Sequence, residues 1–85
     1  MTIYRYRLPI QDEVTLLMPC FAQILSVQRQ DDNLCMWAIV DPAERPETRR
    51  FEIHGTGNHG RHFHNRKFLA TVRDTWGVWH VFEVA

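Results

Sequence analysis

The run Leu34–Val40, "LCMWAIV", restricts the fold most, because seven consecutive apolar residues suit a strand that is covered on both faces. A turn at 31–33, Asp-Asp-Asn, precedes this run, and these residue types tolerate left-handed backbone and cap a turn with their own side chains. Before the turn, Ile24–Gln30 forms another strand-like run. The sequence therefore predicts a hairpin of the two runs, with Leu34–Val40 as a central strand and the best candidate for the core.

Two more runs alternate with a period of two, which is typical of half-buried strands. Ile3–Leu8 is predicted to be an edge strand, and Arg49–His54 is predicted to point Phe51 and Ile53 inward. The same alternation predicts these outward-facing residues: Arg50, Glu52 and His54. Both runs favour a sheet with one face on the core and one face in solvent.

The last part of the chain predicts a second hairpin. Phe68–Arg73 places Phe68, Ala70 and Val72 on one face, and a turn at 74–77 leads into Val78–Val84. Helical signals are weak by comparison. Only residues 11–18 could form a short helical turn, and the proline at position 19 limits it.

These runs predict one mostly β domain over residues 1–85, a small antiparallel barrel or sandwich of about six strands with little or no helix. A chain of 85 residues buries only about 60% of its unfolded surface, so the core should be thin. Exposed strand edges on so small a sheet invite self-association. We therefore expect a homo-oligomer, a dimer or a larger closed assembly.

No apolar run approaches the length of a membrane helix, and no charged-then-apolar leader opens the sequence. We therefore expect neither a membrane segment nor a signal peptide, and a reducing cytosol as the location. Cys20 and Cys35 should then be free thiols that serve as small hydrophobic residues.

Charge is balanced overall but unevenly distributed. Residues 45–67 hold six basic side chains and two acidic ones, whereas residues 1–44 hold three basic and six acidic ones. Such a dipole steers anions toward one end of a molecule, although a solvated basic loop is an equally good interpretation. Because the formal net charge is +0, a general DNA-binding protein is not expected.

The stretch at 55–60, "GTGNHG", matches the dinucleotide-binding pattern G-x-G-x-x-G, but only seven residues separate Gly60 from the strand-like run at Phe68. A Rossmann crossover takes about a dozen or more, so this interpretation is excluded. Successive glycines can instead turn backbone N–H groups inward to cradle a phosphate, with arginines and aromatic rings nearby. A tight turn and core aromatic residues are the alternative. The predicted ligand-binding residues are Arg49, Arg50, His54, Gly55, Thr56, Gly57, His59, Arg61 and Trp79.

Metal binding and catalysis are less well supported. Four histidines fall within eleven residues, at positions 54, 59, 62 and 64, but no cysteine or carboxylate lies in this cluster to complete a metal site. Nucleophilic catalysis needs an activated side chain, and the single serine, Ser26, lies inside a predicted strand. We therefore expect no metal, no cofactor and no enzymatic activity.

Four segments, "IYRYRLPIQDE", "AQILSVQRQDDNLCMWAIVDP", "ETRRFEIHGTG" and "VWHVFE", give the chain a resemblance to a family of short, uncharacterised proteins of tailed phages and prophages. Members commonly continue Gly-Thr-Gly with His-Pro, whereas this chain has Asn58-His59-Gly60. The resemblance implies a counter-defence protein in the host cytoplasm that sequesters a phosphorylated nucleotide immune signal. Its alternatives are an inhibitor that binds a host defence complex, such as a CRISPR effector, and a structural accessory protein of the phage.

Overall fold

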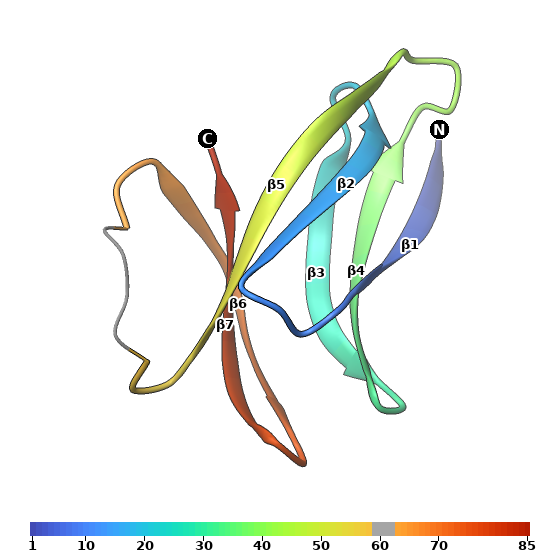
Figure 1. Cartoon of the computed structure of the whole chain (residues 1–85). Helices are drawn as coiled ribbons and strands as arrows, with labels where there is room; N and C mark the ends of the chain where they lie inside the picture. The colour runs from blue at the N-terminus through green and yellow to red at the C-terminus, as the bar shows by residue number, and fades with distance from the viewer. Residues whose placement is uncertain (59–62) are drawn as a thin grey trace.

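The computed structural model describes residues 1–58 and 63–85, and Figure 1 traces their seven β-strands. The strands are β1 (Thr2–Leu8), β2 (Glu13–Pro19), β3 (Gln23–Gln30), β4 (Asn33–Val40), β5 (Pro46–Gly55), β6 (Arg66–Asp74) and β7 (Gly77–Val84). All neighbouring strands pair antiparallel, and the described residues contain no helix. The predicted all-β antiparallel fold is confirmed, with seven strands in place of about six.

The strands form two sheets, with the orders β1-β4-β3 and β2-β5-β7-β6. Both predicted hairpins are present, since β3 pairs with β4 and β6 pairs with β7. β4 lies between β1 and β3 as predicted, and its residues Leu34, Met36, Ala38 and Val40 are buried. β1 is an edge strand, also as predicted.

The expectation of a short helical turn within residues 11–18 is wrong, because Glu13–Pro19 forms β2 and pairs with β5. Val14, Leu16 and Met18 recur with the period of a strand, and Val14 and Met18 are buried. This period-two pattern is short, and the segment forms a strand because its backbone pairs with β5. Pairing between distant segments therefore determined the local structure.

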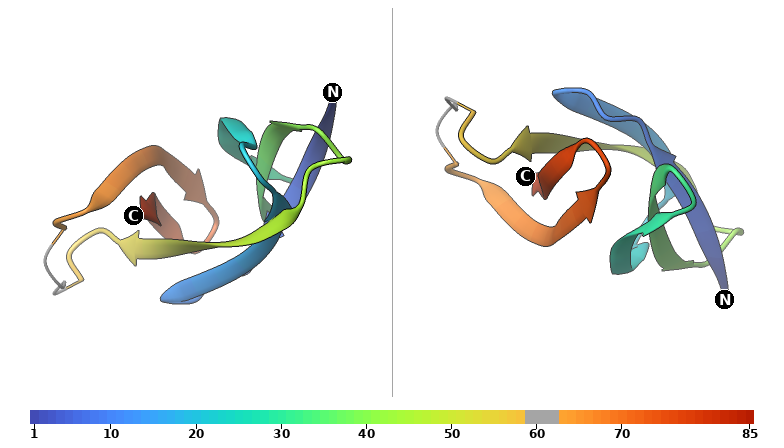
Figure 2. Two further views of the ribbon diagram at one scale, coloured as in Figure 1. Left: turned by 90° about the horizontal axis from the view of Figure 1, so that it is seen from above. Right: turned by 90° about the horizontal axis from the view of Figure 1, so that it is seen from below.

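The core lies between the two sheets, which curve around it (Figure 2). Phe51 and Ile53 of β5 point inward as predicted, and they pack with apolar residues of both sheets such as Met36 and Val81. The molecule is flat, with principal extents of 40 × 30 × 16 Å. Cys20 and Cys35 are free thiols.

Each sheet has an irregular edge where the two sheets meet. In β3 the residue between Ile24 and Ser26 has no partner on β4, and in β6 the residue between Phe68 and Ala70 has no partner on β7. Each of the two strands therefore carries one extra residue, a β-bulge. The bulge in β6 overturns the expected alternation, because Phe68 does not share the inner face with Val72 and is 55% exposed. β3 and β6 contact each other without pairing.

Among the described residues, no helix is long and apolar enough to cross a membrane.

Candidate binding cleft

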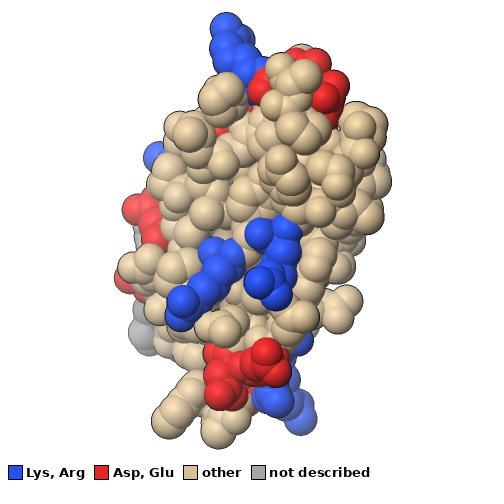
Figure 3. Space-filling view, turned by 90° about the vertical axis from the view of Figure 1, so that its right-hand side faces the viewer, with Lys and Arg blue, Asp and Glu red and all other residues tan. Residues whose placement is uncertain are grey.

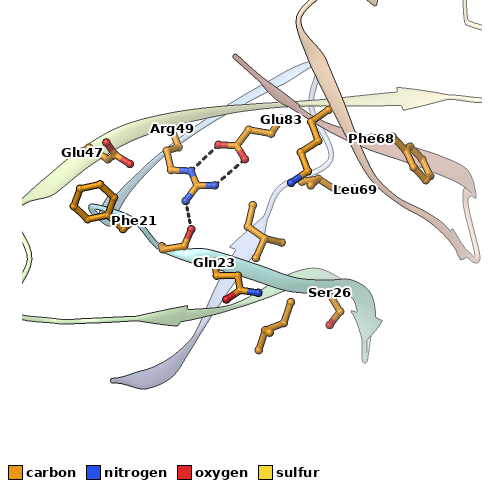
Figure 4. Close-up of a pocket in the computed structure, with 12 residues that line it drawn as sticks. Phe21, Gln23, Ser26, Glu47, Arg49, Phe68, Leu69 and Glu83 are labelled. Atoms are coloured by element: carbon orange, nitrogen blue, oxygen red, sulfur yellow. Dashed lines mark hydrogen bonds and ion pairs between the residues drawn. The ribbon is translucent and has the colours of Figure 1, made fainter.

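A cleft of about 800 Å³ opens where the free edges of β3 and β6 diverge (Figure 4). Its walls come from the turn before β3, from the two bulged strands and from the ends of β5 and β7. The lining residues are Phe21–Ser26, Glu47, Arg49, Lys67–Leu69 and Glu83. Its volume falls in the range of known ligand sites.

An ion pair between Arg49 and Glu83 lies inside the cleft. The Arg49 Nε and Nη2 atoms donate hydrogen bonds of 2.6 and 2.8 Å to the two carboxylate oxygens of Glu83. A third bond, of 2.6 Å, runs from Arg49 Nη1 to the carbonyl oxygen of Ala22. The hydrogen bond to Glu83 raises the pKa of Arg49 above its ordinary value, although burial acts in the opposite sense. Arg49 therefore ties β5 and β7 to the start of β3.

The bulges determine which side chains border the cleft. An inserted residue shifts the alternation of a strand, so that side chains beyond it change face. Leu25 is the extra residue of β3 and is 46% exposed, while Leu69 is the extra residue of β6 and is half-buried against the core. The result is an apolar border on both edges of the cleft.

Phe21 lies at one end of the cleft, opposite Phe68 (Figure 4). It is 87% exposed, and its φ of 66° places it in the left-handed region. The Ala22 N–H bonds to the Pro19 carbonyl at 3.2 Å, so Phe21 occupies the third position of a β-turn, where positive φ favours glycine or asparagine. A bulky residue in this conformation lowers the free energy of unfolding by about 1–2 kcal/mol. Because the Phe21 side chain is exposed, its burial offsets little of this loss.

The predicted glycine loop forms a different and smaller site. Gly55, Thr56 and Trp79 come together around a cavity of about 320 Å³, which Trp76, 84% exposed, also borders. A Cβ atom on Gly55 would lie only 3.2 Å from the Trp79 ring, which explains the glycine at this position. The structure therefore brings the first half of the loop together with Trp79.

The backbone donors of this loop are largely in use. Thr56 N–H donates to the Val78 carbonyl and Asn58 N–H donates to the Gly55 carbonyl, each at 3.2 Å. The Thr56 hydroxyl bonds to His80 Nε2 at 2.7 Å. The part of the loop that the structure describes is therefore a hydrogen-bonded turn with few N–H groups left for an anion.

The predicted arginines do not converge on the loop. Arg49 is committed to Glu83 in the cleft, and Arg50 lies exposed on β5, paired with Thr15 and Val84. Arg50 and Gly55 are five positions apart along the strand, a distance of about 17 Å. His59 and Arg61 lie outside the described residues. Phosphate binding by this loop stays a prediction.

Sequence reasoning missed the environment of Glu52. The alternation predicted an outward, solvated side chain, but Glu52 is 1% exposed, so this prediction is wrong. Arg66 Nη2 and Nε donate to its carboxylate at 2.8 and 3.2 Å, and His54 Nε2 lies 3.0 Å from Oε1. The hydrogen bond to Glu52 is also the main cause of the raised pKa of Arg66.

Aromatic rings cover this polar group, which explains why the second face of β5 is buried. Phe63 lies 5.1 Å from the rings of both His54 and Phe82, and Phe68 packs on Phe82 at 5.6 Å. His54 therefore belongs to a hydrogen-bonded cluster in which its ring meets Phe63 and Phe82 edge to face. Within residues 1–58 and 63–85, no three metal-ligating side chains are grouped to hold an ion.

Gly57→Ala is expected to lower the free energy of unfolding by about 1 kcal/mol, because Gly57 has a φ of 86°. A Cβ at this position meets no atom within 4 Å, so the cost comes from backbone conformation alone. Chemical denaturation measures it. Gly57→Asn is the control and should lose less, since asparagine tolerates positive φ; equal losses in both variants would contradict the backbone explanation.

Fold and cleft together define a small two-sheet antiparallel β domain with an open cleft between its sheet edges. The chain belongs to the family described as Domain of unknown function (DUF7352), whose model matches residues 1–85. This match confirms that one family spans the chain, while the tailed-phage setting stays a prediction. No curated protein and no solved structure matched the chain.

Proposed function

We propose that the protein is a non-catalytic binding protein that takes up an extended segment of a partner protein in the cleft between β3 and β6. Phe21 carries this proposal. An exposed phenylalanine in left-handed backbone, at a turn position that suits glycine, contributes nothing evident to stability. Aromatic side chains of this kind are typical anchors of protein interfaces.

The free strand edges support an extended ligand. β3 and β6 are the outermost strands of their sheets, and both run downward in Figure 1, so one segment could lie antiparallel to either edge. The β3 residues 23–26, Gln-Ile-Leu-Ser, carry no charge, whereas the β1 edge carries Arg5 and Arg7. Charged residues protect an edge from pairing, so the β3 edge is the more open to strand addition.

Polar groups of the cleft favour a polypeptide over a phosphorylated ligand. The Arg49 guanidinium is saturated by Glu83 and the Ala22 carbonyl, and the carboxylate of Glu47 adds negative charge. Lys67 is the remaining cation of the lining. A phosphate group would face two carboxylates, while a peptide backbone can bond to strand edges and place apolar side chains against Leu25 and Phe68.

The resemblance to tailed-phage proteins supports a host protein as the partner. We therefore propose inhibition of a host defence complex in the host cytoplasm as the biological role. Sequestration of a phosphorylated nucleotide and a structural role in the virion are the competing roles. A second copy of the chain, as expected for a homo-oligomer, is a competing occupant of the cleft.

Selection of displayed random peptides on the immobilised protein tests this proposal. Enriched peptides should carry apolar residues at alternate positions, because side chains of a strand alternate between faces. Phe21→Asn should weaken their binding at least about tenfold, measured by fluorescence anisotropy. The same variant should fold as stably as the wild type, since asparagine tolerates the left-handed region.

Trp76→Asn is the matched control, because Trp76 is equally exposed but lies outside the cleft. Its peptide affinity should stay within about twofold of the wild type. The proposal fails if no peptide is enriched, or if Trp76→Asn weakens binding and Phe21→Asn does not. A concentration-dependent mass that Phe21→Asn abolishes would instead identify a second copy as the occupant.

A further inference from the structure

Two arginines on the outer face of the first sheet have no acidic partner among the residues that the structure describes. Arg5 and Arg7 are two residues apart in β1, so both side chains leave the same face, with Cα atoms about 7 Å apart. Neither forms an ion pair in the described part of the chain, whereas Arg49 and Arg66 each hold a carboxylate. Figure 3 views the β1 side, where basic side chains lie in the middle of the face and acidic side chains lie at its top and bottom.

The two arginines border a small hollow of about 180 Å³. Arg7 is opposite Cys35 in the β1–β4 register, and the buried Cys35 lines the same hollow. Further lining comes from the end of β3 and the turn that follows it, namely Gln30, Asp31 and Asn33. Gln30 and Asn33, which carry side-chain amides, therefore border the hollow together with the two arginines.

One guanidinium is held in place. Arg5 Nη1 donates a 2.6 Å hydrogen bond to the Gln30 side-chain oxygen, which limits the movement of Arg5 and leaves its other N–H groups available. Asp31 borders the hollow, yet it forms no ion pair with either arginine. The hollow thus combines residues that carry side-chain amides with two guanidinium groups, which form no ion pair among the described residues. Both kinds of group donate hydrogen bonds to an oxyanion.

We propose that Arg5 and Arg7, with Gln30 and Asn33, form an oxyanion site for a single phosphate group. The site is separate from the cleft and independent of the proposed polypeptide binding. It also offers a second location for the phosphate chemistry expected from the sequence, because Arg5 and Arg7 lie on β1, in the other sheet from the strands that flank the glycine loop. Trp37, opposite Arg5 in the register and half-buried, adds an apolar surface next to the site.

Titration of the ¹⁵N-labelled protein with inorganic phosphate at constant ionic strength tests the site. Saturable shifts are expected at the Arg5 and Arg7 Nε–H signals and at the Trp37 indole. Arg7→Gln should weaken phosphate binding at least about tenfold, because one fork of charge-assisted bonds is lost. Arg73→Gln, an exposed arginine of β6, is the charge-matched control and should bind as the wild type does.

Two further titrations identify the source of the group. Tighter binding of a nucleoside monophosphate than of inorganic phosphate supports a phosphate ester as the natural ligand, and equal binding supports free phosphate. Tighter binding of succinate than of either would replace the phosphate assignment with a carboxylate. The proposal is overturned by shifts that rise linearly without saturation, or by equal losses in Arg7→Gln and Arg73→Gln.

Discussion

Glu52→Ala is expected to lower the free energy of unfolding by about 3 kcal/mol, which is a large share of the stability of a small domain. Glu52 is 1% exposed, and its carboxylate accepts hydrogen bonds from Arg66 and lies against His54. Its removal leaves the partly exposed guanidinium of Arg66 and the half-buried ring of His54 without their carboxylate partner. Chemical denaturation with a common reference measures the loss.

Glu13→Ala is the control for this prediction. Glu13 is opposite Glu52 in the β2–β5 register, but it is exposed, so its removal should change stability by less than about 0.5 kcal/mol. A Glu52→Ala variant within 1 kcal/mol of the wild type would contradict the view that the buried carboxylate organises the outer face of β5.

Arg49→Ala is expected to cost about 2 kcal/mol, because the side chain makes two bonds to Glu83 and one to the Ala22 carbonyl. The ion pair is partly open to water, with 17% of each side chain exposed, so the loss should be smaller than for Glu52. The loss of the bond to Ala22 should also loosen the start of β3. Amide hydrogen exchange should therefore quicken at residues 22–24.

The neighbouring arginine supplies a control with the same side chain. Arg50 lies exposed on the other face of β5, so Arg50→Ala should change stability by less than about 0.5 kcal/mol. Equal stability of the two variants would contradict the claim that the three hydrogen bonds of Arg49 stabilise the contact between the two sheets. Both arginines were candidate ligand residues, and this pair of variants separates a structural role from a ligand-binding one.

The sequence predicted those strands whose apolar pattern is local. The unbroken apolar run Leu34–Val40 implied a central strand, and β1 and β3 do flank it. The prediction that both of its faces are covered is only partly right, because Trp37 and Ile39 on the outer face are half-buried. The turns at 31–33 and 74–77 are also encoded locally. Asp31 adopts a φ of 56°, and Asp74 caps the second turn through bonds to the Trp76 and Gly77 N–H groups.

What the sequence could not predict depends on contacts between distant segments. β2 exists because β5 pairs with it, and the burial of Glu52 depends on Phe63 and Arg66, which follow in a separate segment. The aromatic residues at 63, 68 and 82 were the available signal, but only the pairing of β6 with β7 places them over β5.

The candidate site was predicted only in part, for an electrostatic reason. Basic residues concentrate at 45–67 in the sequence, yet Arg49 and Arg66 hold carboxylates from other strands. Charge counted along the chain therefore does not equal charge free to bind a ligand. The border of the cleft depends on the bulges at Leu25 and Leu69. The sequence of one strand does not predict a bulge, because a bulge is defined by the pairing with the neighbouring strand.

Polypeptide capture between β3 and β6 is the central claim, and backbone NMR of the ¹⁵N-labelled protein, saturated with the tightest selected peptide, tests it most directly. We expect the largest amide shifts at residues 21–26 and 67–69, together with slower hydrogen exchange along the β3 edge. Shifts concentrated at Thr56–Asn58 and Trp76, with the two edges unchanged, would contradict the claim and return the binding function to the glycine loop.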